Sequence, residues 1–170
     1  MSSAISEYRL ELLITNENAT QYYQPNGRQR YTHNPENAGV DLYCMTSQEY
    51  TATPALVPLG VKARLVKLTE DGPVEVHYWL LPRSSIIRSG FMMANSVGII
   101  DKSYRGELMA PVISVGENRD QTITPGTRLF QIVAPDMGWI REVVFVSQLS
   151  ETHRGEGGFG STGTGVQSYA

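Results

Sequence analysis

Glycine and proline interrupt this chain at short intervals, and this punctuation restricts its possible folds more than any other pattern in the sequence. The chain has 16 glycines and 9 prolines among 170 residues, and they are spread out rather than clustered, except at the C-terminal end. Many short strands fit between such breaks, whereas no long amphipathic helix is visible. We therefore expect an all-β fold with a jelly-roll-like, antiparallel architecture.

The expected strands are short apolar or alternating runs bounded by turn residues. Val74–Tyr78 alternates with a period of two, which is typical of a half-buried strand. Ser84–Ala94 is the one stretch predicted to form a short helix or an irregular excursion, and the polar segment Ala19–Asn37 is predicted to be a long loop or, as an alternative, a binding arm. The full set of expected strands is Tyr8–Thr15, Gly39–Met45, Leu56–Lys67, Val74–Leu81, Ser96–Ile100, Glu107–Val115, Thr127–Ala134 and Ile140–Ser147.

Length and composition set the domain organisation and exclude several classes of protein. We expect one β domain over residues 1–150 and a flexible tail over residues 151–170, where apolar periodicity ends. The net charge is −3 and basic residues form no run, which argues against a nucleic-acid partner. No apolar run reaches the ~18–20 residues that span a bilayer, and residues 1–11 do not resemble a secretory signal. We expect a cytoplasmic protein, in the host cytoplasm if its source is a virus, without a membrane partner.

Cysteine and histidine usage argues against a metal site built by protein side chains. Cys44 is a single cysteine in an apolar strand, so it is expected to be a buried small side chain that forms no internal disulfide. His33, His77 and His153 lie far apart in the sequence, and none stands at ligand spacing from another histidine or from Cys44. A phosphate-binding loop of the G-x-x-x-x-G-K-[ST] type is also missing from the sequence.

The glycine-rich C-terminal segment has two interpretations. Gly155–Gly165 holds six glycines in eleven residues, which is typical of a flexible tail. The same composition frees successive backbone amides to surround a phosphate, with serine and threonine hydroxyls as further donors. Arg154 and Phe159 add a guanidinium and an aromatic ring within this segment, which favours a loop that binds an anionic, ring-containing ligand.

Two further constellations could carry chemistry, although each has a simpler structural interpretation. Asp101 follows the apolar run Gly98–Ile100, where an aspartate commonly caps a turn. The same position favours a partly desolvated carboxylate that could act as a general base. Leu81–Ser85 combines a proline-stiffened strand exit with the guanidinium of Arg83, which suits either phosphate binding or a solvated salt bridge.

Five pieces of the sequence, in this order, resemble the motifs of the trimeric dUTP pyrophosphatase (dUTPase) family. The resemblance runs from Gly39 to Gly163 and implies an enzyme that hydrolyses dUTP to dUMP and pyrophosphate. It also implies a homotrimer of jelly-roll subunits, whose tail closes over a neighbouring subunit's site, and Mg²⁺ held through substrate phosphates and water rather than directly by protein. The matching pieces are G-V-D-L-Y, P-R-S-S, A-N-S-V-G-I-I-D-K-S-Y-R-G-E, P-G-T-R-L-F-Q and R-G-E-G-G-F-G-S-T-G.

The resemblance also assigns a role to individual residues. It implies that Asp101 activates the water that attacks the α-phosphorus, and that the ring of Tyr104 packs under the deoxyribose and excludes a 2′-hydroxyl. It implies that Asp41 supports the phosphates and the metal-bound water. The other residues implied to bind substrate are Asn95 and Gly98 for uracil, Arg83, Ser84 and Ser85 for the phosphates, Gln131 for phosphate or water, Arg154, Gly160, Ser161 and Thr162 for the γ-phosphate, and Phe159 stacked on uracil.

One departure from the family pattern keeps alternatives open. Ser85 stands where P-R-S-G is the commoner form, and R-S-S-I-I-R resembles the dCTP deaminases, which share the fold. A deaminase, or a bifunctional deaminase and dUTPase, needs a glutamate near Pro111, and Glu107 comes too early. A second role in protein binding is a further alternative, through Ala19–Asn37 or Thr164–Ala170.

Overall fold

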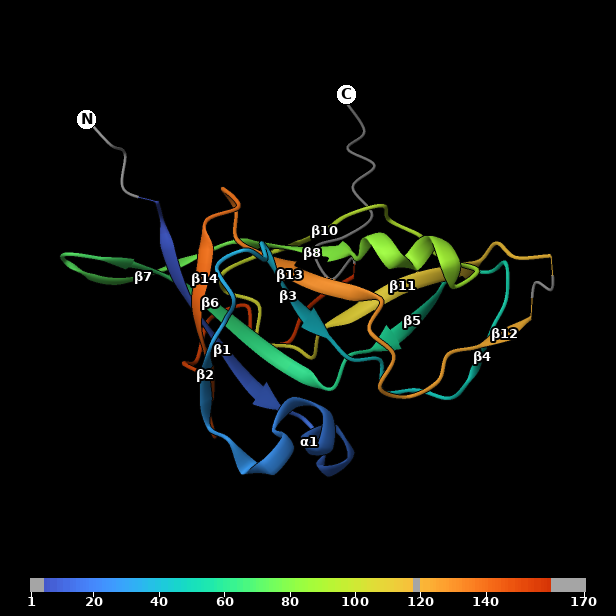
Figure 1. Cartoon of the computed structure of the whole chain (residues 1–170), viewed down its shortest axis with the longest axis horizontal. Coiled ribbons are helices and arrows are strands. Elements are labelled where there is room, and N and C mark those ends of the chain that lie inside the picture. Colours follow the sequence, from blue (N-terminus) through green and yellow to red (C-terminus); the bar gives the residue numbers. More distant parts are fainter. Residues whose placement is uncertain (1–4, 118–119, 160–170) are drawn as a thin grey trace, which may run out of the picture.

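The computed structural model describes residues 5–117 and 120–159, and this part of the chain is built mainly of β-strands (Figure 1). The expectation of an all-β, jelly-roll-like fold is confirmed. The helical elements are α1 (Glu17–Tyr23) and the 3-10 helices η1 (Pro25–Gly27) and η2 (Ser84–Arg88). The strands are β1 (Glu7–Ile14), β2 (Arg30–Thr32), β3 (Gly39–Leu42), β4 (Glu49–Tyr50), β5 (Ala55–Pro58), β6 (Val61–Thr69), β7 (Gly72–Val76), β8 (Tyr78–Pro82), β9 (Phe91–Met93), β10 (Gly98–Ile100), β11 (Met109–Ser114), β12 (Gln121–Thr122), β13 (Phe130–Val133) and β14 (Trp139–Phe145).

The strands form four sheets, and two of them dominate the fold. The larger has the order β2-β14-β1-β6-β7, and the other has the order β10-β8-β13-β3. Two small sheets, β5-β11-β9 and β12-β4, complete the described part. The pairing of β1 with β14 is parallel, which differs from the wholly antiparallel expectation. A parallel pair needs a long crossover connection, and here nearly the whole chain lies between the two strands.

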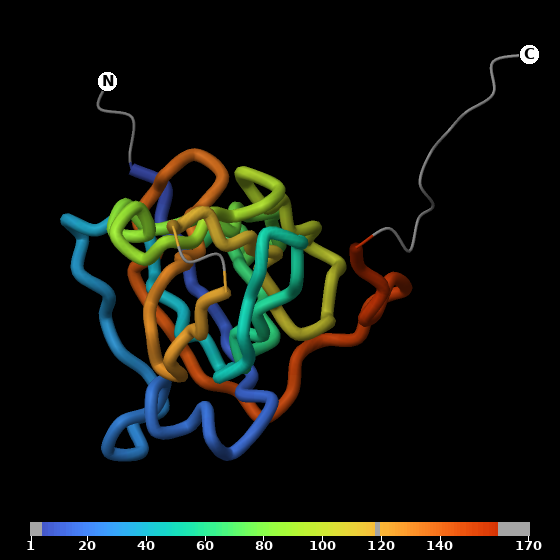
Figure 2. Tube along the Cα trace, turned by 90° about the vertical axis from the view of Figure 1, so that its right-hand side faces the viewer, coloured from blue at the N-terminus to red at the C-terminus, as the bar shows by residue number. Residues whose placement is uncertain are grey.

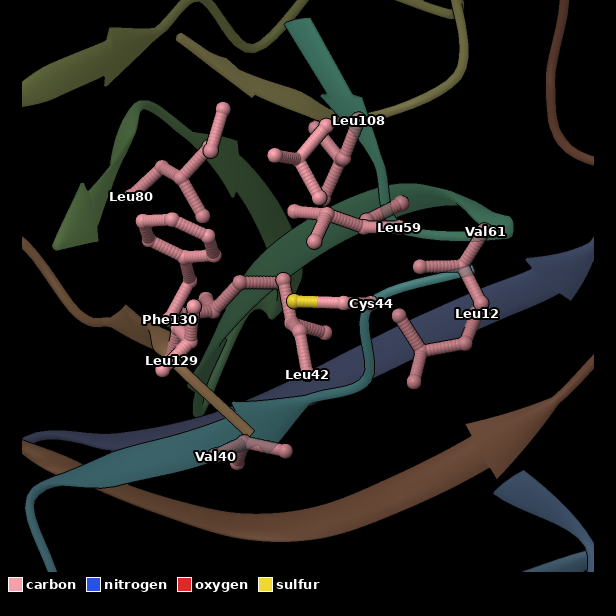
Figure 3. Close-up of a cluster of buried hydrophobic side chains, with 14 of the residues drawn as sticks. Leu12, Val40, Leu42, Cys44, Leu59, Val61, Leu80, Leu108, Leu129 and Phe130 are labelled. Carbon is pink, nitrogen blue, oxygen red and sulfur yellow. The ribbon is translucent and has the colours of Figure 1, made fainter. Parts of the chain in front are cut away.

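The core lies between these sheets and is built from the inward-facing residues of their strands. Figure 3 shows the sulfur of Cys44 among leucine and valine side chains that come from several strands. Burial raises the pKa of the Cys44 thiol to about 12, so this residue is the buried small side chain that its apolar strand predicted. Each strand that carries a site residue is therefore anchored by neighbours fixed in the same core.

The prediction of a long loop over Ala19–Asn37 was wrong, because this segment contains most of α1, all of η1 and β2. The side chain of Asn16 caps α1 by accepting a hydrogen bond from the amide of Ala19 at 3.0 Å. The Tyr23 hydroxyl is buried, donates to the carbonyl of Leu59 at 2.6 Å and accepts from the amide of Tyr43 at 2.9 Å. A helix of under two turns shows no apolar periodicity, and these tertiary contacts stabilise it instead.

Two segments predicted as single strands are each split where the chain changes sheets. Leu56–Lys67 breaks at Gly60, whose φ of +70° suits glycine, and the chain passes there from β5 to β6. Val74–Leu81 breaks at His77, where the chain leaves β7 in the larger sheet and enters β8 in the four-stranded sheet. No helix in the described ranges is long and apolar enough to cross a membrane.

Candidate active site

The predicted site residues fall in two groups at opposite edges of the four-stranded sheet. Asp101 directly follows β10, which forms one edge, and Asp41 lies in β3, which forms the other. Gln131 on β13 pairs in register with Asp41 on one side and with Leu81 of β8 on the other. Two strands therefore separate the two aspartates that the sequence predicted to serve one site.

The first group surrounds a cavity of about 220 Å³, which we call the Asp101 pocket. Its apolar floor and walls come mainly from β8, β9 and β10 and from the start of β11. The structure brings six of the predicted residues together here: Asn95, Gly98, Asp101, Tyr104, Arg154 and Phe159. A cavity of this kind, with an apolar interior and a few polar groups at its mouth, is typical of a small-molecule site.

The Asp101 carboxylate has a different partner on each oxygen. Oδ2 forms an ion pair with the guanidinium of Arg154, and Oδ1 lies 3.6 Å from Nδ1 of His77. The side chain is 44 % exposed, which is more open than its position after an apolar strand suggested. The reason is that β10 is an edge strand, whose Ile99 side chain also points outward and is 67 % exposed. The carboxylate is therefore accessible to solvent and to a ligand in the pocket.

Tyr104 presents its ring to the pocket, because its hydroxyl is already engaged. The hydroxyl donates to the carbonyl of Glu107 at 3.0 Å, and the Tyr104 amide donates to the carbonyl of Asp101 at 3.0 Å, which closes the turn. Burial raises the pKa of the phenol, and the charges of Glu156 and Glu107 raise it further, so the ring stays neutral. Gly158 lies against the ring, and a Cβ at that position would come within 3.0 Å of Cε2.

Residues 150–159, which we call the tail segment, are held against the Asp101 turn of the same chain (Figure 2). Arg105 is only 7 % exposed and donates to the carbonyl of Ser150 at 2.7 Å and to the carbonyl of Lys102 at 2.7 Å. The amide of Arg105 also donates to the carbonyl of Gly155 at 2.7 Å. In this structure the tail segment therefore borders its own chain's pocket, whereas the resemblance implied that of a neighbouring subunit.

The second group surrounds a larger and more polar cavity of about 480 Å³, which we call the Asp41 pocket. Asp41 Oδ1 lies 2.7 Å from Nε of Arg83, and its Oδ2 lies 3.1 Å from a terminal nitrogen of Arg128. Arg83 also donates to the hydroxyl of Ser85 at 3.3 Å. The predicted residues in or beside this cavity are Asp41, Arg83, Ser84, Ser85 and Gln131. Arg28 and Arg128 also line the cavity, so three arginines face two carboxylates, those of Asp41 and Glu36, and the net positive charge suits binding of an anion.

Comparison with known proteins identifies the family. The family model of dUTPase matches residues 30–163. The chain belongs to the dUTPase family. It is 37 % identical over 130 residues to a deoxyuridine 5′-triphosphate nucleotidohydrolase of Desulfitobacterium hafniense, covering 76 % of this chain and 83 % of that protein. It is 34 % identical over 131 residues to the protein of the same name from Finegoldia magna, covering 75 % and 85 %.

A solved structure supports the same placement. The crystal structure of dUTPase from Streptococcus mutans is similar to this chain with a TM-score of 0.51 and 25 % sequence identity, covering 84 % of this chain and 99 % of that one. The matched range of the family begins at residue 30, so α1 and η1 lie outside it. Tyr22 and Arg28 from this unmatched part line the Asp41 pocket.

Sequence reasoning missed three residues of this dUTPase-family site. In the sequence, His77 bears only on metal binding, and Arg105 and Arg128 appear only as members of motifs, without a role of their own. The pairing of β8 with β10 places His77 opposite Asp101, and this pairing has no signal in the sequence. The two arginines have no signal either, because their partners are distant in sequence. Gly160, Ser161 and Thr162 lie outside the described residues.

Proposed function

We propose that the chain hydrolyses dUTP to dUMP and pyrophosphate, with Asp101 as the group that activates water. The observation that carries this proposal is the Asp101 carboxylate at the mouth of an apolar cavity whose wall contains a neutral aromatic ring. Family membership supports the substrate and the reaction class.

In the proposed reaction, each side of the Asp101 pocket has a separate task. Asn95 and the backbone at Gly98 read the uracil, and the ring of Tyr104 packs against the deoxyribose, where a 2′-hydroxyl would clash. Asp101 takes a proton from a water molecule as that water attacks the α-phosphorus in line with the leaving pyrophosphate. Arg154 must release the carboxylate for this step, since its guanidinium pairs with Asp101 in the substrate-free chain.

The phosphate chain is proposed to bind the residues of the Asp41 pocket. Arg83, Ser84 and Ser85 supply a guanidinium and hydroxyls, and Gln131 adds an amide beside them. Asp41 orients two arginines rather than taking part in chemistry, because both of its oxygens are already paired. This assignment agrees with the supporting role that the sequence predicted for Asp41.

We propose a homotrimer, in which each complete site combines the Asp101 pocket of one subunit with the Asp41 pocket of another. The separation of the two groups at opposite edges of one sheet supports this arrangement. Exposed apolar side chains at the Asp101 edge, namely Val97 and Ile99, support burial of this region against a second copy. The reach of the tail segment to a neighbouring subunit's site stays a prediction.

Mg²⁺ is the proposed cofactor, held through the triphosphate and water. Within residues 5–117 and 120–159 no three His, Cys, Asp or Glu side chains are grouped to hold a metal, and binding through phosphates does not require such a group. Asp41, in the cavity proposed for the phosphates, fits the role of a carboxylate near the metal-bound water. When bound, Mg²⁺ neutralises charge on the phosphate oxygens.

A nucleotide panel tests the reaction and its nearest alternative. dUTP, dCTP, UTP and dTTP are incubated with the protein and Mg²⁺, and ammonia and pyrophosphate are measured separately. We expect pyrophosphate from dUTP and no ammonia from dCTP. Ammonia from dCTP would replace the proposal by a deaminase, and absence of pyrophosphate from dUTP would overturn it.

Subunit mixing tests the trimer and the tail together. Asp101→Asn and Arg154→Ala proteins, each impaired alone, are unfolded, mixed and refolded, with each variant refolded alone as the control. If a tail serves a neighbouring subunit, the mixture regains activity, because an intact Asp101 then meets an intact Arg154 from another chain. If each tail serves its own chain, no site in the mixture is intact and activity stays low. Sedimentation of the wild-type protein as a monomer would contradict the trimer.

A further inference from the structure

His77 occupies a position fixed by strand register rather than by sequence neighbourhood. It is the residue between β7 and β8, where the chain passes from one main sheet to the other. The antiparallel pairing of β8 with β10 aligns Tyr78 with Ile100, so the next residue on each strand brings His77 opposite Asp101. The two side chains meet at 3.6 Å between Nδ1 of the ring and Oδ1 of the carboxylate.

The hydrogen bond at Nδ1 of His77 defines the protonation state and the tautomer of its ring. The amide of Lys102 donates to Nδ1 of His77 at 3.1 Å. A nitrogen that accepts a hydrogen bond carries no proton, so the ring in this arrangement is neutral and its proton is on Nε2. The ring therefore fixes the peptide that joins Asp101 to Lys102, while it donates nothing to the carboxylate.

Protonation of Nδ1 would break the hydrogen bond from the Lys102 amide and make the His77 ring a donor toward Asp101. A protonated Nδ1 cannot accept from the Lys102 amide, and the acceptor nearest to it in this structure is Oδ1 of Asp101. The charged group that faces the ring is the carboxylate of Asp101. Lys102 contacts the ring through its backbone amide, and Arg154 of the tail segment pairs with the other oxygen of Asp101. With both carboxylate oxygens then engaged by cations, Asp101 would be a poorer proton acceptor.

We propose that His77 is a positioning residue for dUTP hydrolysis, which holds the Asp101 turn through the Lys102 amide and leaves Oδ1 of Asp101 open toward water. This proposal rests on the proposed function of Asp101. It adds a residue from the junction of β7 and β8 to the site and makes turnover depend on the neutral form of one imidazole. The side chain is 60 % exposed, so its replacement disturbs little packing.

Two substitutions of His77 test whether turnover depends on the hydrogen bond to the Lys102 amide or only on the volume of the side chain. In His77→Asn the side-chain amide oxygen can take the place of Nδ1 as the acceptor for the Lys102 amide, whereas His77→Ala removes the acceptor. We expect His77→Ala to lower kcat by about three- to tenfold with little change in KM, which corresponds to the loss of one hydrogen bond. We expect His77→Asn to recover kcat to within about twofold of wild type. Equal kcat values for Ala and wild type, or equal losses for Ala and Asn, would overturn the proposal.

The pH profile and an amide signal provide readouts that a structural role would not move. The kcat of wild type should fall at acidic pH, where the ring accepts a proton and loses its bond to the Lys102 amide, and this acidic limb should be absent in His77→Asn. His153→Asn, which removes another exposed imidazole, should retain the limb. The ¹⁵N resonance of the Lys102 amide should titrate over the same range in wild type and not in His77→Asn.

These measurements distinguish the proposal from the function on which it rests. If wild type releases pyrophosphate from dUTP but the limb persists in His77→Asn, or the Lys102 amide does not titrate, the role of His77 is wrong and the proposed function stands. If wild type releases no pyrophosphate from dUTP, the proposed function fails, whatever the Lys102 amide shows.

Discussion

The two edges of the four-stranded sheet each carry an aspartate paired with arginine, yet the two carboxylates are built for different tasks. Asp41 has an arginine on each oxygen, at 2.7 Å and 3.1 Å, and is 26 % exposed. Asp101 has an arginine on one oxygen only, has a neutral imidazole beside the other, and is 44 % exposed. The difference teaches that a saturated carboxylate orients cations, whereas a carboxylate with an open oxygen and a removable partner can accept a proton.

The largest expected effect on turnover is for Asp101, the carboxylate that has an arginine on one oxygen only. Asp101→Asn should lower kcat by a factor of about 10²–10⁴, the usual contribution of a general base, while leaving nucleotide affinity close to wild type. The matched variant Asp41→Asn should instead raise KM by about tenfold and change kcat less, because Arg83 and Arg128 lose their common anchor. For each variant, pyrophosphate release measures kcat and KM, and calorimetry with a non-hydrolysable analogue measures nucleotide affinity. If the two variants show the same division between kcat and KM, the contrast between the edges is wrong.

The second effect concerns the glycine-rich segment that follows Arg154, the partner of Asp101. Deletion of residues 155–170 should lower kcat by about 10²-fold, because the groups that order the site around the substrate are lost. The protein should remain folded and keep the oligomeric state of wild type, since Ser150 stays attached to Arg105. Sedimentation and circular dichroism check this point. Loss of assembly would show that the removed segment is structural rather than catalytic.

A smaller effect should appear in substrate selection at the same edge. Tyr104→Ala should reduce the preference for dUTP over UTP, measured as the ratio of kcat/KM values, by about tenfold or more. The reason is that alanine leaves empty the space of the ring, which packs against Gly158 and is proposed to exclude a 2′-hydroxyl. Tyr104→Phe is the control and should keep the preference. An unchanged ratio in the alanine variant would assign ribose exclusion to another group.

The smallest effect on substrate binding is expected for Arg128, one of the two arginines that pair with Asp41. Arg128→Gln removes one of the two partners of Asp41 but leaves Arg83 in place. Since the Arg128 side chain is half exposed, its ion pair contributes little, and KM should rise by only about two- to fivefold. Measurement of KM at low and high salt checks this, with a smaller difference between variant and wild type at high salt. A loss as large as that of Asp41→Asn would mean that Arg128 binds substrate directly.

Much of the fold was predictable from the sequence, because turn residues and local alternation specify short strands. Gly39–Met45 and Ile140–Ser147 correspond closely to β3 and β14. The helix α1 could not be predicted in the same way, since the contacts of Tyr23 with Leu59 and Tyr43 that hold it are tertiary. The prediction of all-β structure therefore succeeded where local pattern decides and failed where a distant side chain does.

The candidate site shows the same limit more sharply. The sequence identified Asp101, Tyr104 and Arg83 through motifs, but a motif does not state which strands are neighbours. The order β10-β8-β13-β3 places Asp101 and Asp41 apart, and the pairing of β8 with β10 brings His77 to Asp101. Both facts depend on strand order and register, which arise only when the sheet is assembled.

The attachment of Ser150 to Arg105 has a consequence for substrate affinity. It anchors the tail segment beside the turn that carries Asp101, so Arg154 is only four residues from a fixed pivot. A group joined to its anchor by so short a linker has an effective concentration in the millimolar range near its binding partner. An incoming nucleotide whose phosphates bind Arg154 would therefore have to draw this guanidinium away from Asp101, and part of its binding energy would be consumed in that exchange.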